Sequence, residues 1–230
     1  MKHKLDPVCT RYHLAGPSQE PTGSRLGLES GSSGPRFATS NRHLSFDDHI
    51  SQLVARCTGV LIALSHSRHV LPSYTLAFVV NALVVSSIRY CISIYGTCGK
   101  MQLHRVQKLL NFCARVISGR RKYDHISGVL DELKWLRAGQ LVTYHQLCLL
   151  KSVLATGLPY DVAEMFSYVS TVYNTRQTGQ LSCPRAKTGS GARRFVHCGV
   201  LFNGLPPDLR DLRMAPFKRR LKQLLLSESV

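Results

Sequence analysis

Apolar side chains recur every three or four residues over much of the chain after residue 40, and this spacing is typical of one face of an α-helix. The first such stretch comprises Phe46, Ile50, Leu53, Cys57, Val60, Leu61 and Leu64. Ser45 stands just before it, and Asp48 follows three residues later. A Ser side chain at this position accepts a hydrogen bond from an unpaired N–H, and a carboxylate in the first turn complements the helix dipole. The pattern therefore predicts an amphipathic helix that begins at Ser45.

The stretch 70–88 contains no charged residue and is just long enough to span a membrane. It also contains Pro72, Asn81 and several hydroxyl side chains, which suit a helix buried in protein better than one in lipid. We expect a helix from Pro72 to about Cys91 at the centre of the core, because it is apolar nearly all round. A membrane-spanning helix is the alternative.

The rest of the chain predicts further helices, a turn and one strand. Helices are expected at about 100–118, 126–136, 141–156, 161–168 and 215–226, a turn at 92–99, a loop at 171–191 and a strand at 192–202. Gly119 and Gly157 end two of the helices. The fold class predicted is mainly α: a thumb-like helical bundle with a small C-terminal α/β or irregular region.

Three domains are predicted: a leader at 1–40, a helical bundle at 41–137 and a basic C-terminal region at 138–230. The leader is rich in Gly, Ser and Pro, lacks apolar periodicity and is expected to be disordered. No apolar segment follows Met1, so no signal peptide is expected. The eight cysteines form no CxxC pair, which favours a reduced, intracellular protein of the cytoplasm or nucleus over a secreted disulfide scaffold.

Lys and Arg outnumber Asp and Glu by 30 to 13, which gives a formal net charge of +17. Nine Lys/Arg stand against three acids in 100–137, and eleven against three from 174 to the end. Such an excess predicts contact with a polyanion, and nucleic acid is the commonest one. The candidate binding residues are Arg105, Lys108, Arg115, Arg120, Arg121, Lys122, Arg193, Arg194, Lys218, Arg219, Arg220 and Lys222.

No motif in the sequence predicts a catalytic, metal or cofactor site. The Asp47–Asp48 pair resembles metal-binding aspartates, but a helix cap explains both carboxylates. The histidines and cysteines lack the spacing of zinc ligands. Neither a nucleophile elbow nor a phosphate-binding glycine loop is present. We therefore expect a protein without catalytic residues and without a cofactor.

The order of several short motifs resembles the region downstream of the palm in reverse transcriptases of non-LTR (LINE-type) retrotransposons. Residues 44–50 resemble the family's L-x-W-x-x-H-I helix start, and 89–96 resemble the Y-G-x-x-x-W-G end of its thumb helix. Residues 103–108 resemble L-x-R-L-Q-N, and 174–176 are similar to its N-T-R element. Residues 194–206 resemble R-S-F…W-N-x-L-P, so the likeness covers most of 44–226.

The chain also departs from the family's pattern. Cys91 replaces a glycine, and Tyr95 and Phe202 replace tryptophans. Nothing resembles the aromatic-x-Asp-Asp hairpin of the palm, and the endonuclease and fingers are missing. The resemblance therefore implies a truncated, non-catalytic fragment with a thumb bundle that packs along a template–primer duplex. Its expected partner is RNA or an RNA–DNA duplex.

Three alternatives remain open at this point. The chain could complete a polymerase whose palm lies on another chain. It could be a membrane-associated helical protein anchored near 70–88. It could also be the product of a pseudogene without a function.

Overall fold

Helices are the only regular elements in residues 46–169 and 179–228, the part of the chain that this computed structural model describes. One isolated antiparallel bridge between Tyr168 and Leu181 is the β-type pairing found there. All described residues belong to a compact unit that runs from Phe37 to Val230. The mainly α fold class is confirmed, whereas the leader 1–40, Ser45 and the motif 174–176 lie outside the described residues.

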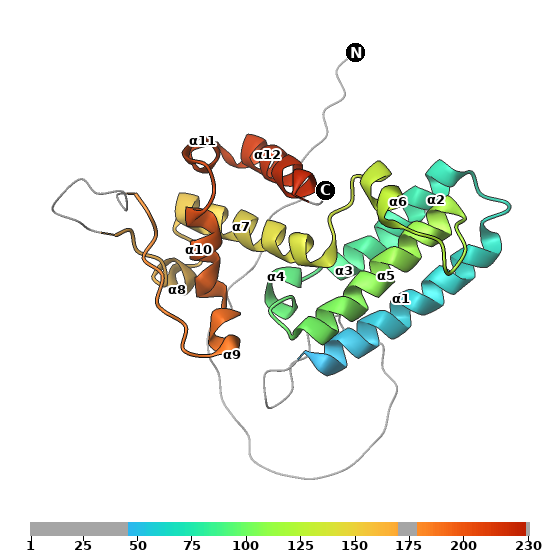
Figure 1. Cartoon of the computed structure of the whole chain (residues 1–230), viewed down its shortest axis with the longest axis horizontal. Coiled ribbons are helices and arrows are strands. Elements are labelled where there is room, and N and C mark those ends of the chain that lie inside the picture. The colour runs from blue at the N-terminus through green and yellow to red at the C-terminus, as the bar shows by residue number, and fades with distance from the viewer. Residues whose placement is uncertain (1–45, 170–178, 229–230) are drawn as a thin grey trace, which may run out of the picture. The chain divides into compact units, whose positions relative to one another are not determined.

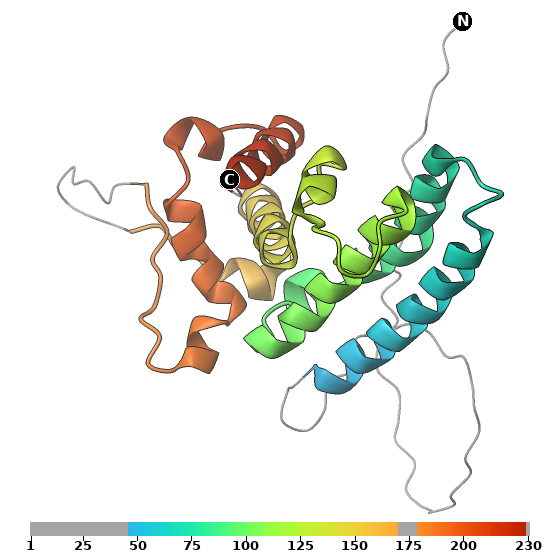
Figure 2. The same ribbon diagram turned by 45° about the vertical axis from the view of Figure 1, so that its right-hand side comes forward.

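Helices α1 (Asp47–Ser67) and α5 (Lys100–Ser118) run side by side, as Figures 1 and 2 both show. The buried face of α1 comprises His49, Ile50, Leu53, Cys57 and Leu61, and that of α5 comprises Val106, Leu109, Leu110, Cys113, Ala114 and Val116. These faces follow the predicted spacing. The N-cap residue of α1 is Phe46, one residue later than predicted, and it makes no side-chain capping bond. Gly119 ends α5 at φ 71°, as predicted.

The apolar stretch after residue 70 forms α2 (Ser73–Val80), a π-helical turn (Asn81–Val85) and α3 (Ser86–Arg89) in succession. Its expected place at the centre of the core is wrong. Tyr74 and Phe78 on its outer side are 77 % and 73 % exposed. The segment packs against α1 and α5 along its inner face. No helix in the described ranges is long and apolar enough to cross a membrane.

A short helix, α4 (Ile92–Tyr95), occupies the position of the predicted turn. Cys91 precedes it at φ 54°, a left-handed conformation that favours glycine. The Tyr95 side chain is fully buried, its hydroxyl donates a hydrogen bond to the Ile88 carbonyl, and its ring lies 5.1 Å from that of His49. A Cβ atom on Gly96 would lie 2.4 Å from Val142 Cγ2, so α4 approaches α7 closely.

Helix α7 (Ala138–Thr156) follows α6 (Ser127–Glu132) and is fixed at its start by side-chain amides. The Ala138 N–H donates to Gln107 Oε1 of α5 at 2.6 Å, and the Arg137 N–H donates to Gln140 Oε1 at 3.0 Å. The Gln140 Nε2 group donates to the Leu225 carbonyl at 2.5 Å. Unpaired N–H groups at a helix start are thus satisfied by partners that also tie α7 to its neighbours.

The C-terminal part consists of α8 (Tyr160–Ala163), α9 (Gly189–Ala192), a 3-10 turn (Phe195–His197), α10 (Cys198–Asn203), α11 (Pro207–Arg210) and α12 (Met214–Ser227). The predicted strand at 192–202 is therefore wrong, and with it the α/β character of this region. Helix α10 packs on α7, and the Asn203 side-chain amide pairs with both the N–H and the C=O of Leu181 at 2.9 Å. These two hydrogen bonds join the end of α10 to the segment at Leu181.

Helix α12 lies across α7 with Phe217, Leu221 and Leu225 buried (Figure 2). Its bounds match the predicted helix to within one residue. The predicted domain boundary at 137/138 stays a prediction, and helices from its two sides, α5 and α7, pack against each other.

Candidate nucleic-acid interface

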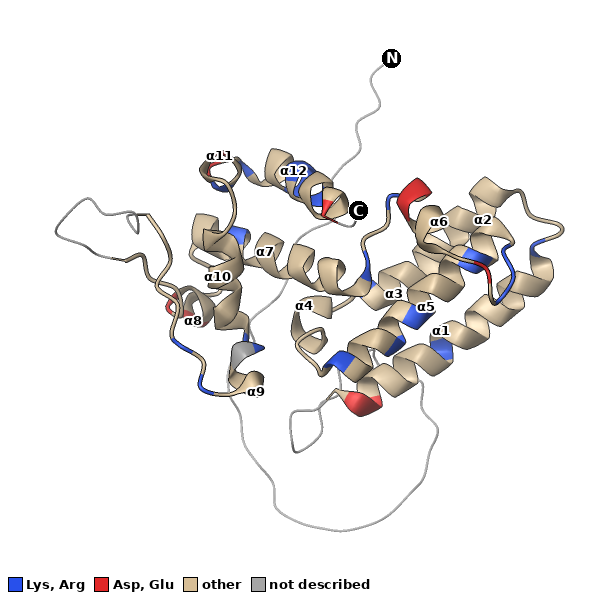
Figure 3. Ribbon diagram, viewed as in Figure 1, with Lys and Arg blue, Asp and Glu red and all other residues tan. Residues whose placement is uncertain are grey.

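The solvent side of α5 carries one face of basic and polar side chains. On a helix with 3.6 residues per turn, His104, Lys108, Asn111 and Arg115 fall on the side opposite the buried residues. Lys108 is exposed and Arg115 is half-buried. Figure 3 shows Lys and Arg along α5 and in the turn that follows it.

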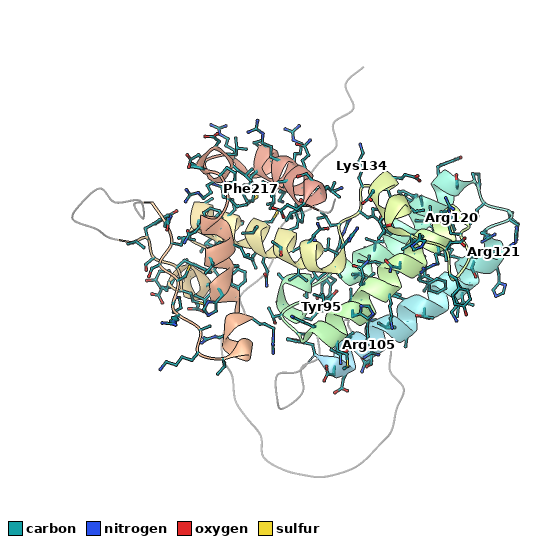
Figure 4. All side chains as sticks on the ribbon, in the orientation of Figure 1. Tyr95, Arg105, Arg120, Arg121, Lys134 and Phe217 are labelled. Carbon is teal, nitrogen blue, oxygen red and sulfur yellow. The ribbon has the colours of Figure 1, made fainter. Side chains whose placement is uncertain are left out.

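Arg105 serves a different purpose on the same helix. Its Nη1 group donates to Ser51 Oγ of α1 and to Gln102 Oε1, both at 3.0 Å. Figure 4 places Arg105 near the beginning of α1 and α5, whereas Arg120 and Arg121 lie beyond the other end of α5. We therefore assign Arg105 to the packing of α1 on α5 rather than to the interface.

A basic hollow of about 450 Å³ lies at the C-terminal ends of α1 and α5. Its lining comprises Ser65, Arg68, Phe112, Arg115, Val116, Arg120 and Lys122. The Arg115 Nη2 group donates to the Asp124 carbonyl at 3.4 Å, whereas its buried Nε has no hydrogen-bond partner. The hollow thus joins three predicted binding residues with Arg68, which the sequence reading missed.

The turn after α5 exposes Arg120, Arg121 and Lys122 to solvent. The Arg121 N–H donates to Asp124 Oδ2 at 2.8 Å, which holds the turn in place. Cations at this position also complement the carbonyl end of the α5 dipole, so they stabilise the helix end as well as presenting charge. Lys122 Nζ lies 5.6 Å from the ring centroid of Tyr123, whose side chain is 88 % exposed. We call Arg68, Lys108, Arg115, Arg120, Arg121 and Lys122 the α5 surface.

The remaining predicted residues lie on two other parts of the fold. Arg193 and Arg194 are exposed and line a hollow of about 390 Å³ beside α7 and α10. Lys218 and Lys222 of α12 line a separate pocket of about 340 Å³. Arg219 and Arg220 are exposed on α12 and line neither cavity. The structure therefore divides the twelve candidates among separate sites rather than one.

One sequence signal includes every member of the α5 surface, although it does not separate them from other cations. No Asp or Glu occurs between Asp48 and Asp124, whereas ten Lys or Arg do. Counting charge from residue 100 onward missed Arg56, Arg68 and Arg89, which belong to the same acid-free stretch. The stretch supplies no carboxylate of its own, so its net charge is positive and favours an external anion.

The described residues contain no group of three or more His, Cys, Asp or Glu that could hold a metal ion. Burial raises the pKa values of the Cys113 and Cys198 thiols to about 12. Thiols of this kind stay protonated near neutral pH and are poor nucleophiles and ligands. Asp47 and Asp48 are exposed in the first turn of α1, as expected of helix-start carboxylates.

The chain matches no protein-family model, no curated protein and no solved structure. The likeness to non-LTR reverse transcriptases therefore stays a prediction.

Proposed function

We propose that the chain binds the sugar–phosphate backbone of RNA or an RNA–DNA duplex through the α5 surface, without chemistry of its own. The stretch between Asp48 and Asp124, which contains no Asp or Glu, carries this proposal. It folds so that Arg68, Arg115, Arg120 and Lys122 line one hollow, with Lys108 farther along the same helix face. Such an arrangement replaces the counterions of several phosphates and is largely indifferent to base sequence.

The proposal includes descent from the thumb of a non-LTR reverse transcriptase, and the turn at 89–96 supports it. The family's motif has glycine at the positions of Cys91 and Gly96, and the backbone at both positions favours glycine. Cys91 adopts a left-handed φ, and Gly96 leaves no room for a Cβ atom. Tyr95 and Phe202, which stand where the motifs have tryptophan, are both buried. A second chain that carries a palm would be a natural partner of such a piece.

Neutralising the turn after α5 tests the proposed function. In the full-length protein, Arg120→Gln, Arg121→Gln and Lys122→Gln together should weaken binding to a fluorescent RNA–DNA hybrid at least about tenfold at low salt. The matched control combines Arg185→Gln, Lys187→Gln and Arg213→Gln, which removes the same charge from exposed positions outside the hollow.

The control variant should lose less than about threefold in affinity. Equal losses in the two variants would mean that net charge alone, and not the α5 surface, holds the duplex. Circular dichroism of both variants should show nearly the same helix content, because all six side chains are exposed and the loss of charge at the end of α5 costs less than about 1 kcal/mol.

A further inference from the structure

A second basic site lies between α3, α7 and α12, and we call it the α12 pocket. It encloses about 340 Å³, near the lower limit for sites that take small organic ligands. Its lining comprises Val85, Arg89, Leu110, Trp135, Leu136, Leu141, Tyr144, His145, Cys148, Lys218 and Lys222. The charged and titratable groups among these residues are the cations Arg89, Lys218 and Lys222 and the His145 imidazole, and no carboxylate is among them.

The cations of the α12 pocket lie close enough to repel one another. Burial lowers the pKa of Lys222, and the charges of Arg89 and Lys134 lower it further. Burial, Arg89 and Lys218 likewise lower the pKa of His145. An anion in the pocket would offset this repulsion, so binding and charge relief would act together.

Two of these cations belong to α12, and the packing of α12 on α7 sets where they emerge. Lys218 and Lys222 lie one turn apart on α12, whose Phe217, Leu221 and Leu225 are buried. The Gln140 side chain bonds to the Leu225 carbonyl and fixes α12 against the start of α7. Arg89 ends α3, just before the left-handed residue Cys91. The part of α12 that carries Lys218 and Lys222 is therefore held against α7 before any ligand arrives.

The inner part of the α12 pocket has a different chemistry. Trp135 and Leu136 are buried there, and Leu110 of α5 adds a further apolar surface. The half-buried Tyr144 ring stands beside His145, at 5.4 Å between ring centroids. An inorganic ion would use only the cationic rim, whereas a ligand with a planar group would also cover the apolar interior.

We propose that the α12 pocket binds a nucleoside monophosphate group, with its phosphate among Arg89, Lys218 and Lys222 and its planar base toward Trp135. The group can come from a free nucleotide or from the phosphorylated end of a nucleic-acid strand. The proposal does not depend on the α5 surface, because the two sites share no residue.

Trp135 provides the measurement, because it is the chain's only tryptophan and lines the pocket. Titration of the full-length protein with uridine monophosphate should change its fluorescence in a saturable way. Uridine absorbs light as strongly as uridine monophosphate but lacks the phosphate. It should therefore lower the measured fluorescence only by absorbing light. Inorganic phosphate should bind at least about tenfold more weakly than the nucleotide, since it leaves the apolar interior open.

Two neighbouring residues of α12 make a matched pair of variants. Lys218→Ala should weaken uridine monophosphate binding about tenfold, the scale of one charge-assisted hydrogen bond to phosphate. Arg219→Ala removes the same charge one residue away, outside the pocket, and should change binding less than about twofold. Both substitutions are at exposed positions, so circular dichroism should show the same fold.

Competition separates the two sources of the ligand. A 5′-phosphorylated oligonucleotide that displaces uridine monophosphate better than its 5′-hydroxyl twin identifies a strand end as the ligand. Equally weak competition by the two oligonucleotides identifies the free nucleotide. The proposal is overturned if uridine monophosphate gives no more than the uridine signal, or if Lys218→Ala and Arg219→Ala weaken its binding equally.

Discussion

The α5 surface and the α12 pocket both gather Lys and Arg, but they do so in opposite ways. On the α5 surface the cations are spread along a helix and an exposed turn, and Arg115 is half-buried between them. In the α12 pocket they converge on one enclosed space, where burial and mutual repulsion lower the pKa values of Lys222 and His145. An extended array of charges suits a polymer of phosphates, whereas convergent charges suit a single compact anion.

Burial also changes how strongly neighbouring charges affect one another. Screening by water keeps exposed charges nearly independent of one another, so each contributes a similar increment of polyanion binding. In the α12 pocket Lys222 and His145 are half-buried, and Arg89 contributes to the lowered pKa of each, so removing Arg89 should raise both pKa values. We therefore expect graded responses from substitutions on the α5 surface and coupled responses in the α12 pocket.

The largest expected effect comes from removing the buried side chain that anchors α12. Phe217 is fully buried, and Phe217→Ala should lower the free energy of unfolding by about 3–5 kcal/mol. Since α12 carries Lys218 and Lys222, nucleotide binding should be lost, whereas hybrid binding by the folded fraction should persist. Urea unfolding and the two binding assays measure these effects. Loss of hybrid binding in parallel with nucleotide binding, at equal folded fraction, would mean that the two sites are not separate.

The segment 89–96 begins with Arg89 of the α12 pocket and lies just before α5. The substitution Gly96→Ala tests how this segment packs. The added Cβ would lie 2.4 Å from both the Ile92 carbonyl oxygen and Val142 Cγ2, so α4 and α7 would have to move apart. We expect a loss of about 1–3 kcal/mol in the free energy of unfolding. Gly99→Ala, where a Cβ meets nothing within 4 Å, is the control and should cost less than the Gly96 substitution.

The pH dependence of nucleotide binding sharpens the contrast. A bound phosphate favours the protonated imidazole, so it raises the lowered pKa of His145 and binding takes up protons. Uridine monophosphate affinity should therefore rise as pH falls from about 8 to about 6.5, above the second ionisation of the phosphate. Burial and the nearby charges of Arg89 and Lys134 lower the pKa of Lys222, and a bound phosphate opposes this shift too. Tyr144 and Cys148, whose pKa values are raised, stay neutral in this pH range.

His145→Gln is the control for this titration, and it should flatten most of the rise in affinity between these pH values. An unchanged pH profile in the variant would show that His145 does not contact the bound anion.

The smallest effect concerns the left-handed residue before α4. Cys91→Gly should raise the free energy of unfolding by about 0.5–1 kcal/mol, because glycine adopts φ near 54° without strain. Ser93→Gly, two residues further along and within α4, should instead destabilise the protein, since glycine weakens a helix interior. Thermal melts of the two variants would show shifts of opposite sign. A destabilised Cys91→Gly would remove one support for the proposed ancestry.

The sequence predicted best those helices that have a regular apolar face and a residue that ends the helix. Helix α5 begins and ends where predicted, because its apolar face is regular and Gly119 ends it in a left-handed conformation. The stretch 192–202 was wrongly predicted as a strand because Phe195, Val196 and Phe202 fit either structure in so short a run. In the structure this stretch is helical, and Asn203 at its end bonds to Leu181, a partner that no local pattern reveals.

The two sites differ in how far apart their residues lie in the sequence. Five of the six residues of the α5 surface lie within 108–122, so a local charge count located them. Only the structure shows that Arg68 joins them. Arg89 and His145 meet Lys218 and Lys222 only through the packing of α3, α7 and α12. The tryptophan beside them, Trp135, comes from yet another segment. A pocket assembled from such distant segments leaves no pattern along the chain.

The most direct test of the proposed function is the salt dependence of hybrid binding by the full-length protein. If the α5 surface neutralises roughly four to six phosphates, a log–log plot of affinity against salt should have a slope of about −3 to −5. Neutralising Arg120, Arg121 and Lys122 should then flatten the slope by about 2–3, at 0.7–0.9 per phosphate contact. Absence of binding at low salt, or a slope near zero, would contradict electrostatic binding of nucleic acid by this chain.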